Sequence, residues 1–228
     1  MRGFFEIPHY TGIHLAFSRN MALENLNQLV RSSIFQKIPL EWSNKKVNKA
    51  LRKLSTEAGK KFEQIVEENL ATIGITGRRS INKQIGNKRN FIKIPSEVGE
   101  IDFLGYSASE NFVLIAECKL VQAGFEGKFF RDDIQDFIKS NKSYLKKFDR
   151  KVKWLLNNHS AAISALNSMQ IHSAQIKPTK IVAAFITYYP TIAQYFIEDY
   201  PCVSITNLIL DYKDKNKWFY SKGIFDLP

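Results

Sequence analysis

The sequence predicts an α/β fold in which a mixed central β-sheet is flanked by helices. Residues 112–120 are almost continuously apolar, as expected of a strand that is covered on both faces. Residues 131–156 carry a regular apolar stripe at helical spacing. Helical and strand-like segments alternate along much of the chain, and this order favours a sheet packed between layers of helices.

The first 50 residues are predicted to be an N-terminal helical extension, and residues 51–228 are predicted to be the main domain. Residues 1–20 look extended, and a helix is expected over 20–36 because apolar residues recur along one side of it. Those residues are Met21, Leu26, Leu29, Val30 and Ile34.

Residues 43–73 are predicted to form one or two helices. Ser43 can cap their start, Gly74 can end them, and Gly59 is the place for a break between them. The first part of this segment is strongly basic, which is typical of a solvated helix face and also of a surface that follows nucleic-acid phosphates. Its basic residues are Lys45, Lys46, Lys49, Arg52, Lys53, Lys60 and Lys61.

The later elements are predicted from apolar runs and from the turn residues between them. The full order is helix, three strands, helix, strand, helix, strand, so the first six elements follow the order αβββαβ. Strands are expected at 89–95, 100–106, 112–120, 180–189 and 202–210, and helices at 131–156, 159–170 and 191–200.

The composition favours a basic protein of the cytoplasm. The 228 residues include 33 lysines and arginines against 22 acidic residues, a net charge of +11. This excess favours a polyanionic partner such as nucleic acid, although an ordinary basic protein has the same balance. The two cysteines, Cys118 and Cys202, make no disulfide framework. Since the chain has no signal-like segment and no apolar run of about 20 residues, we expect no membrane partner.

Two acidic residues are predicted to face each other across a hairpin. The segments "GEIDFLGY" and "NFVLIAECKL" flank a polar turn around "SASE". If an even-numbered loop pivots about Ser109 and Glu110, Asp102 lies opposite Glu117, whereas an odd-numbered loop would break this register. Facing carboxylates repel each other unless a proton or a cation lies between them. A divalent cation with oxygen ligands would satisfy the pair.

Lys119 is predicted to share the face of Glu117, because side chains alternate along a strand, while Cys118 points to the opposite, apolar side. An ammonium group there can neutralise a phosphate or orient an attacking water, and burial would ease its deprotonation if it acted as a base. Only this copy of the acid–any–Lys triplet ends an apolar strand with a second acid 15 residues before it. The alternative interpretation is a surface salt bridge at a sheet end. The four copies begin at Glu117, Glu126, Asp149 and Asp211.

The stretch "GEIDFLGY…VLIAECKL" resembles the core of the PD-(D/E)XK nuclease superfamily, especially its Holliday-junction-resolvase and Mrr-type branches. The resemblance implies a restriction-endonuclease-like core within 51–228 and hydrolysis of DNA phosphodiester bonds with Mg²⁺, for which Mn²⁺ would substitute. It implies that Asp102 and Glu117 bind the metal together with the Cys118 carbonyl, and that Lys119 is the catalytic lysine. One departure is Ile101, which stands where the motif name has proline.

The same family places an acidic residue on the helix before the sheet, and "GKKFEQIVEENL" at 59–70 is similar to that helix. Of its three acids, Glu63 lies at the border of the apolar face set by Phe62, so Glu63 is the candidate fourth site residue and metal ligand. An ordinary solvated glutamate is the alternative. The other two acids are Glu67 and Glu68.

Contacts with DNA are expected from residues near the helix that follows the Glu-x-Lys strand, although ordinary surface roles explain them as well. These residues are Lys128, Arg131, Gln135 and Lys142. By analogy with enzymes that cut both strands, we expect a homodimer, and the chain fits a longer protein or a defence complex. Restriction, phage defence and recombination would all use such an activity. The alternatives are a non-catalytic nucleic-acid-binding module on the same fold and an RNA-directed enzyme.

Overall fold

The computed structural model describes residues 4–10, 12–36, 38–122, 127–169 and 175–228. The chain divides into two compact units, Met1–Ala58 and Gly59–Pro228, called here the N-terminal unit and the main unit. Helix α2 (Lys45–Thr72) crosses this boundary without interruption, so the break that the sequence suggested at Gly59 does not occur. No helix in the described ranges has the length and apolar character needed to cross a membrane.

The N-terminal unit begins with a β-hairpin rather than with irregular extended chain. Strands β1 (Phe4–His9) and β2 (Gly12–Phe17) pair antiparallel. Helix α1 (Arg19–Ile34) follows, and the Ser18 hydroxyl caps it by accepting a hydrogen bond from the Met21 amide. The predicted apolar side of α1 is largely exposed, since Leu26 and Val30 are 54% and 58% accessible. A 3₁₀ turn (Leu40–Trp42) leads into α2.

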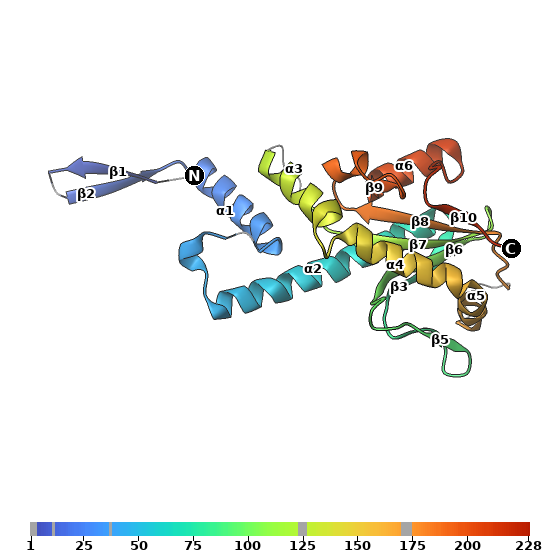
Figure 1. Ribbon diagram of the computed structural model, residues 1–228. Helices are drawn as coiled ribbons and strands as arrows, with labels where there is room; N and C mark the ends of the chain where they lie inside the picture. The colour runs from blue at the N-terminus through green and yellow to red at the C-terminus, as the bar shows by residue number, and fades with distance from the viewer. Residues whose placement is uncertain (1–3, 11, 37, 123–126, 170–174) are drawn as a thin grey trace. The chain divides into compact units, whose positions relative to one another are not determined.

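The main unit is an α/β fold with a mixed sheet, as the sequence predicted (Figure 1). The strand order is β10-β8-β7-β6-β3, and β9 also pairs with β8. The β3–β6–β7 part is antiparallel, whereas β8 runs parallel to β7 and to β9. The strands are β3 (Ile75–Ile81), β6 (Ile101–Ser107), β7 (Phe112–Lys119), β8 (Lys180–Thr187), β9 (Cys202–Ser204) and β10 (Ile224–Asp226).

The strands that precede β6 differ from the prediction. The first of the three consecutive core strands is β3, a segment that was not predicted because its polar middle, "TGRRS", hides the alternation. The predicted strand at 89–95 is instead β5 (Phe91–Lys93), which pairs with β4 (Gln84–Gly86) outside the main sheet. With β3 in the first place, α2, β3, β6, β7, α4 and β8 still follow the order αβββαβ.

The helices after β7 are shorter than predicted. The single helix expected at 131–156 is divided into α3 (Gly127–Ile134), a π-helical turn (Gln135–Lys139) and α4 (Tyr144–Asn157). The division occurs because the Ser143 hydroxyl caps a new helix by accepting a hydrogen bond from the Lys146 amide. Helix α5 (His159–Ser168) follows, close to its predicted position.

The last predicted helix is wrong, and the last predicted strand is too long. The segment 191–200 forms only a 3₁₀ turn (Ile192–Tyr195). The expected strand at 202–210 ends at Ser204, whose hydroxyl accepts a hydrogen bond from the Asn207 amide and caps helix α6 (Ile205–Lys215). This serine cap lies inside an apolar run, where the apolar character alone does not distinguish a buried strand from a buried helix.

Two apolar cores cover the two faces of the sheet. Alternate residues of β7 enter opposite cores, as predicted for a strand that is covered on both sides. Val113 and Ile115 pack with Phe148, Val152 and Leu155 of α4. The opposite core is formed by α2, α6 and the other face of the sheet, and includes Phe62, Val66, Leu70, Leu114, Ala116 and Leu208.

A close approach of two backbones at Gly77 provides a test of this packing. Gly77 of β3 lies opposite Gly105 of β6, and a Cβ at Gly77 would come within 2.3 Å of the Leu104 carbonyl oxygen. We expect Gly77→Ala to lower the free energy of unfolding by about 1–3 kcal/mol, because β3 must move away from β6. Urea denaturation followed by circular dichroism would measure the change.

Gly59→Ala is the matched control, since a Cβ at Gly59 has open space around it within α2. Alanine there should increase stability by about 0.5–1 kcal/mol through its better helix propensity. Equal effects of the two substitutions would contradict the close packing of β3 on β6.

Candidate active site

The hairpin of β6 and β7 has the predicted register. Phe103 pairs with Ala116 and Ser107 with Phe112, so the turn lies where the sequence placed it and an even loop is confirmed. Continued by one residue, this register sets Asp102 opposite Glu117. Both residues are buried, with exposed fractions of 9% for Asp102 and 3% for Glu117. The predicted pair of acids is therefore brought together on the face of the sheet that α4 covers.

Two lysines neutralise this pair of acids. Lys119 Nζ lies 2.8 Å from Glu117 Oε1 and 3.2 Å from Asp102 Oδ2. Lys151 Nζ lies 2.5 Å from Glu117 Oε2 and 3.4 Å from Asp102 Oδ1. Each carboxylate thus binds both ammonium groups through different oxygens, and we call these four residues the charge cluster. Its formal charge is zero, which is how a group of buried charges is tolerated.

Lys151 was not predicted as a site residue. It belongs to the acid–any–Lys triplet at Asp149, which carried no significance as a motif because it lies in a helix. The sequence nevertheless indicated that Lys151 is buried, since it occupies a core position of α4 between Phe148 and Leu155. A lysine in an apolar helical stripe needs a buried partner, and the facing β-hairpin supplies it.

Asp102 is also held by the backbone of the neighbouring strand. Its Oδ2 atom accepts a hydrogen bond of 2.9 Å from the Cys118 amide. The Cys118 side chain lies in the opposite core, as predicted, and burial raises the pKa of its thiol well above the usual value. Cys118 thus anchors β7 while its neighbours form the cluster, and the role of its carbonyl as a metal ligand stays a prediction.

The surroundings of Lys119 favour its charged form. Burial disfavours the charged ammonium, but the negative charges of Glu117 and Asp102 outweigh that effect and raise the pKa of Lys119 above its ordinary value. Burial alone acts in the predicted direction, but the two carboxylates reverse the net effect on the pKa of Lys119. Tyr144, at the start of α4, adds a cation–π contact with Lys119 Nζ 5.1 Å from the ring centroid.

Glu63 lies near the charge cluster on the last part of α2. Its half-buried carboxylate accepts a short hydrogen bond from the Ser80 hydroxyl. Ser80 has a φ of 51°, a left-handed conformation that is uncommon for serine and strained inside a strand. Burial raises the pKa of Glu63, the Ser80 hydrogen bond lowers it, and repulsion from Asp102 and Glu100 raises it further.

The other two acids of the segment 59–70 have different partners. Glu67 forms an ion pair with Arg79 at 2.9 Å, and Glu68 accepts a hydrogen bond from Gln64. Of these three acids, Glu63 is thus the one that lies near Asp102, as helical geometry predicted. Among the described residues, however, no three His, Cys, Asp or Glu side chains gather closely enough to hold a metal ion, so Glu63 does not join Asp102 and Glu117 in one ligand group.

One buried polar atom on this side of the sheet has no partner among the residues that the structure describes. Thr187 lies next to Lys119 in the β7–β8 register and shares its face. Its hydroxyl is buried and makes no hydrogen bond within the described ranges. Such a group needs a partner that is not a side chain of the described residues, such as a water molecule. The two carboxylates and this hydroxyl supply the oxygen chemistry that Mg²⁺ prefers.

The residues expected to contact DNA lie on the surface. Lys128 and Arg131 are exposed on α3, Gln135 is exposed in the π-helical turn, and Lys142 is exposed just before α4. None of the four takes part in the ion pairs of the charge cluster. Their predicted role in binding DNA stays a prediction.

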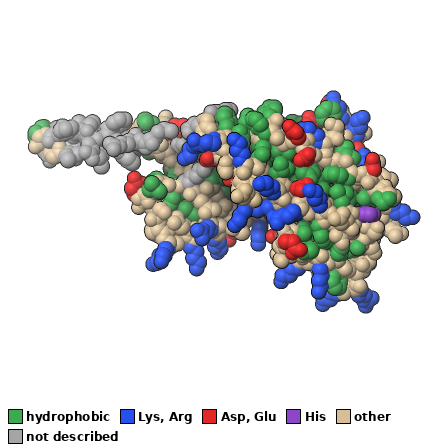
Figure 2. All heavy atoms as spheres, in the orientation of Figure 1, with side chains coloured by type: hydrophobic (Ala, Val, Ile, Leu, Met, Phe, Trp, Pro, Cys, Tyr) green, Lys and Arg blue, Asp and Glu red, His purple; other side chains and the backbone are tan. Residues whose placement is uncertain are grey.

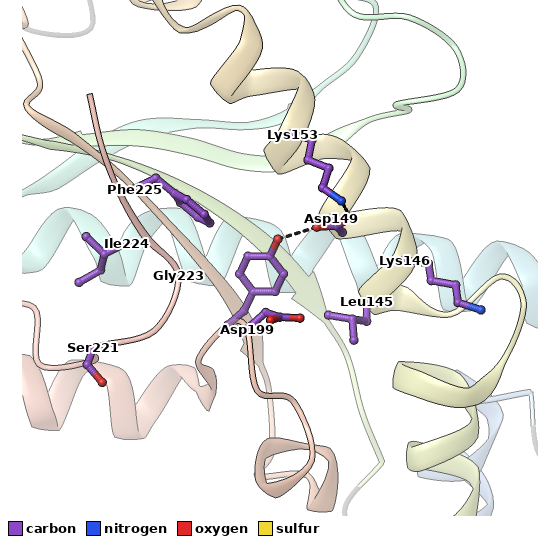
Figure 3. Close-up of a pocket in the computed structure, with 10 residues that line it drawn as sticks. Leu145, Lys146, Asp149, Lys153, Asp199, Ser221, Gly223, Ile224 and Phe225 are labelled. Atoms are coloured by element: carbon purple, nitrogen blue, oxygen red, sulfur yellow. Dashed lines mark hydrogen bonds and ion pairs between the residues drawn. The ribbon is translucent and has the colours of Figure 1, made fainter. Parts of the chain in front are cut away.

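A cavity of about 560 Å³ lies on the other side of α4 (Figure 3). Asp149 and Lys153 line it, form an ion pair of 2.7 Å, and lie about 200° around the helix from Lys151. The Tyr200 hydroxyl donates a hydrogen bond of 3.1 Å to Asp149 in the same place. Helix α4 thus separates this cavity from the charge cluster.

Comparisons with known proteins leave the site to be interpreted from its own chemistry. No family model, no curated protein and no solved structure matches the chain.

The raised pKa of Glu63 predicts a pH-dependent gain in stability when its charge is removed. The folded protein binds a proton at Glu63 more readily than the unfolded chain does, so this residue destabilises the fold at neutral pH. We expect Glu63→Gln to raise the urea midpoint at pH 7, because the glutamine oxygen can still accept the hydrogen bond from Ser80.

The gain should shrink as the pH falls and should vanish below the ordinary value of 4.5, where the carboxyl group is protonated in both states. Glu68→Gln, which removes an exposed carboxylate from the same helix, is the control for loss of charge. A Glu63→Gln variant that is no more stable than the wild type at pH 7 would rule out this account.

Proposed function

We propose that this protein is a metal-dependent DNA endonuclease of the PD-(D/E)XK superfamily, with a restriction-endonuclease-like core. The observation that carries the proposal is the hairpin register, which sets Asp102 opposite Glu117 and puts Lys119 on the same face. The αβββαβ order around this hairpin supports the same assignment. A surface salt bridge explains the arrangement less well, because Asp102 and Glu117 are both buried.

Mg²⁺ would be held by Asp102 and Glu117 with the Cys118 carbonyl, and Mn²⁺ would substitute for it. When bound, the metal would lower the pKa of a coordinated water and offset charge on the phosphate. Because Glu117 and Asp102 raise the pKa of Lys119, this residue would bind a phosphate oxygen or orient the water rather than remove a proton. Glu63 would act from outside the ligand group, where it is held by Ser80.

DNA would be bound through its phosphates by basic side chains. Lys45, Lys49 and Arg52 are exposed on the first turns of α2 and line a shallow hollow together with Asn48. Figure 2 shows lysine and arginine side chains projecting from these first turns. Lys128, Arg131, Gln135 and Lys142 would add contacts from the main unit. The net charge of +11 supports binding of this electrostatic kind.

A non-catalytic nucleic-acid-binding module is the second candidate function. Lys151 favours it, because this ammonium already compensates the two carboxylates without a metal ion. Against it stands the complete set of Asp102, Glu117 and Lys119, whose shared position a purely binding protein would not require. The two functions differ in one measurable respect, which is phosphodiester cleavage.

Cleavage of supercoiled plasmid and of branched DNA in Mg²⁺ or Mn²⁺ tests the proposal. We expect the wild type to cut, and Asp102→Ala and Lys119→Ala to reduce the rate by about 100-fold or more, because each substitution removes charge from the reacting centre. Lys153→Ala, which removes an exposed lysine of α4, should cut at the rate of the wild type. Circular dichroism would confirm that each variant is folded.

Activity that survives both substitutions in the charge cluster would exclude the proposed mechanism. Binding of DNA without cleavage in either metal would instead favour the binding module.

The salt dependence of DNA affinity tests the role of α2. Replacing Lys45, Lys49 and Arg52 together by alanine should weaken binding regardless of sequence, because these side chains would no longer neutralise phosphates. The slope of log affinity against log salt should fall by about 0.9 for each phosphate that is no longer neutralised, as measured by fluorescence anisotropy on a duplex. Alanine at Lys177, Lys213 and Lys217, which are exposed elsewhere, is the matched control for charge. Equal slopes for the two triple variants would argue against this surface.

A further inference from the structure

Lys151 reaches the candidate metal site from a helix, while the other three members of the charge cluster lie on the β6–β7 hairpin. Its ammonium binds one oxygen of each carboxylate, at 2.5 Å from Glu117 and 3.4 Å from Asp102. These are the carboxylates that the proposed function assigns to the metal. A metal ion bound by these carboxylates would therefore have to share oxygens that Lys151 already uses.

Lys151 projects from the buried face of α4 towards the charge cluster. Its side chain is only 8% exposed, whereas that of Lys119 is 21% exposed at the edge of the cluster. Phe148, Val152 and Leu155 on the same face of α4 are buried in the core against the sheet. Lys151 is therefore the more deeply buried of the two lysines that neutralise Asp102 and Glu117.

The net charge of the cluster also indicates that a metal ion and both ammonium groups cannot bind the two carboxylates together. Two carboxylates and two ammonium groups are balanced, so a divalent cation added to this buried cluster would leave an excess of two positive charges. An uncompensated charge in a buried site is strongly disfavoured. Metal binding to the DNA-free protein therefore has to displace an ammonium from at least one carboxylate.

We propose that Lys151 is a built-in competitor of the metal, a tethered cation that holds Asp102 and Glu117 together in the metal-free protein and lowers their affinity for divalent ions. This inference rests on the proposed function, because it takes the two carboxylates as the metal ligands. Lys151 is thus a positioning residue whose removal tightens metal binding and not a group that contacts the substrate.

Binding of Mn²⁺ to the DNA-free, chelator-treated protein tests the competition without any need for activity. Lys151→Met removes the charge and keeps an unbranched side chain, and we expect it to bind Mn²⁺ at least tenfold more tightly than the wild type. Free Mn²⁺ measured by electron paramagnetic resonance gives the affinity. Adding Mn²⁺ should also raise the melting temperature of Lys151→Met more than that of the wild type.

Two controls locate the effect. Lys153→Met removes an exposed lysine from the opposite side of the same helix, and it should bind Mn²⁺ as the wild type does. Adding Asp102→Asn to Lys151→Met should abolish the tenfold gain, because it removes one of the two carboxylates. A gain that persists without Asp102 would place the metal elsewhere and overturn the proposal.

A measurement on the wild type covers the case in which Lys151→Met does not fold. The rate at which acetic anhydride modifies Lys151, read by peptide mass spectrometry, should rise severalfold in saturating Mn²⁺ as the ammonium is released. An unchanged rate would overturn the proposal.

The outcomes separate this inference from the proposed function. Equal Mn²⁺ affinities for the wild type and Lys151→Met would overturn the competition, while DNA cleavage by the wild type would leave the nuclease assignment standing. Failure of both proteins to bind Mn²⁺, together with absence of cleavage, would overturn both.

Discussion

Two carboxylates buried at one end of a β-hairpin impose the main electrostatic constraint on this fold. Asp102 and Glu117 face each other in a region from which water is largely excluded, and their repulsion has to be cancelled. The sheet supplies one cation, Lys119, and α4 supplies the other, Lys151. The position of α4 on the sheet is thus tied to an ionic contact as well as to the apolar stripe that packs beneath it.

The hairpin was predictable from the sequence because its register depends on local features, the polar turn and the alternation of side chains in "NFVLIAECKL". Lys151 was not, because its partners lie 34 and 49 residues away and only the packing of α4 brings them together. Strand β3 was missed because its exposed middle is polar. The cap at Ser143 divides the helix predicted at 131–156, and the cap at Ser204 ends the strand predicted at 202–210. Both predictions failed because the apolar pattern continues past the capping serine.

Strand β7 contributes to two different environments, one on each face of the sheet. Cys118 lies in one apolar core, while Glu117 and Lys119 on either side of it form the charge cluster on the other face. The amide of Cys118 also binds Asp102, so the residue that anchors the strand orients an acid of the site. Since no family model, curated protein or solved structure matches the chain, this local chemistry is the basis on which a nuclease is proposed.

The turn between β6 and β7 has a consequence for how this chain can diverge. Residues 108–111 connect Ser107 to Phe112, and their number decides which side chains face each other further along the ladder. Inserting or deleting one residue would shift the parity of the pairing and move Glu117 and Lys119 to the opposite side of the sheet from Asp102. Length changes of two residues would keep the parity. Evolutionary variation in this loop should therefore be restricted to even steps, even though its own side chains take no part in the chemistry.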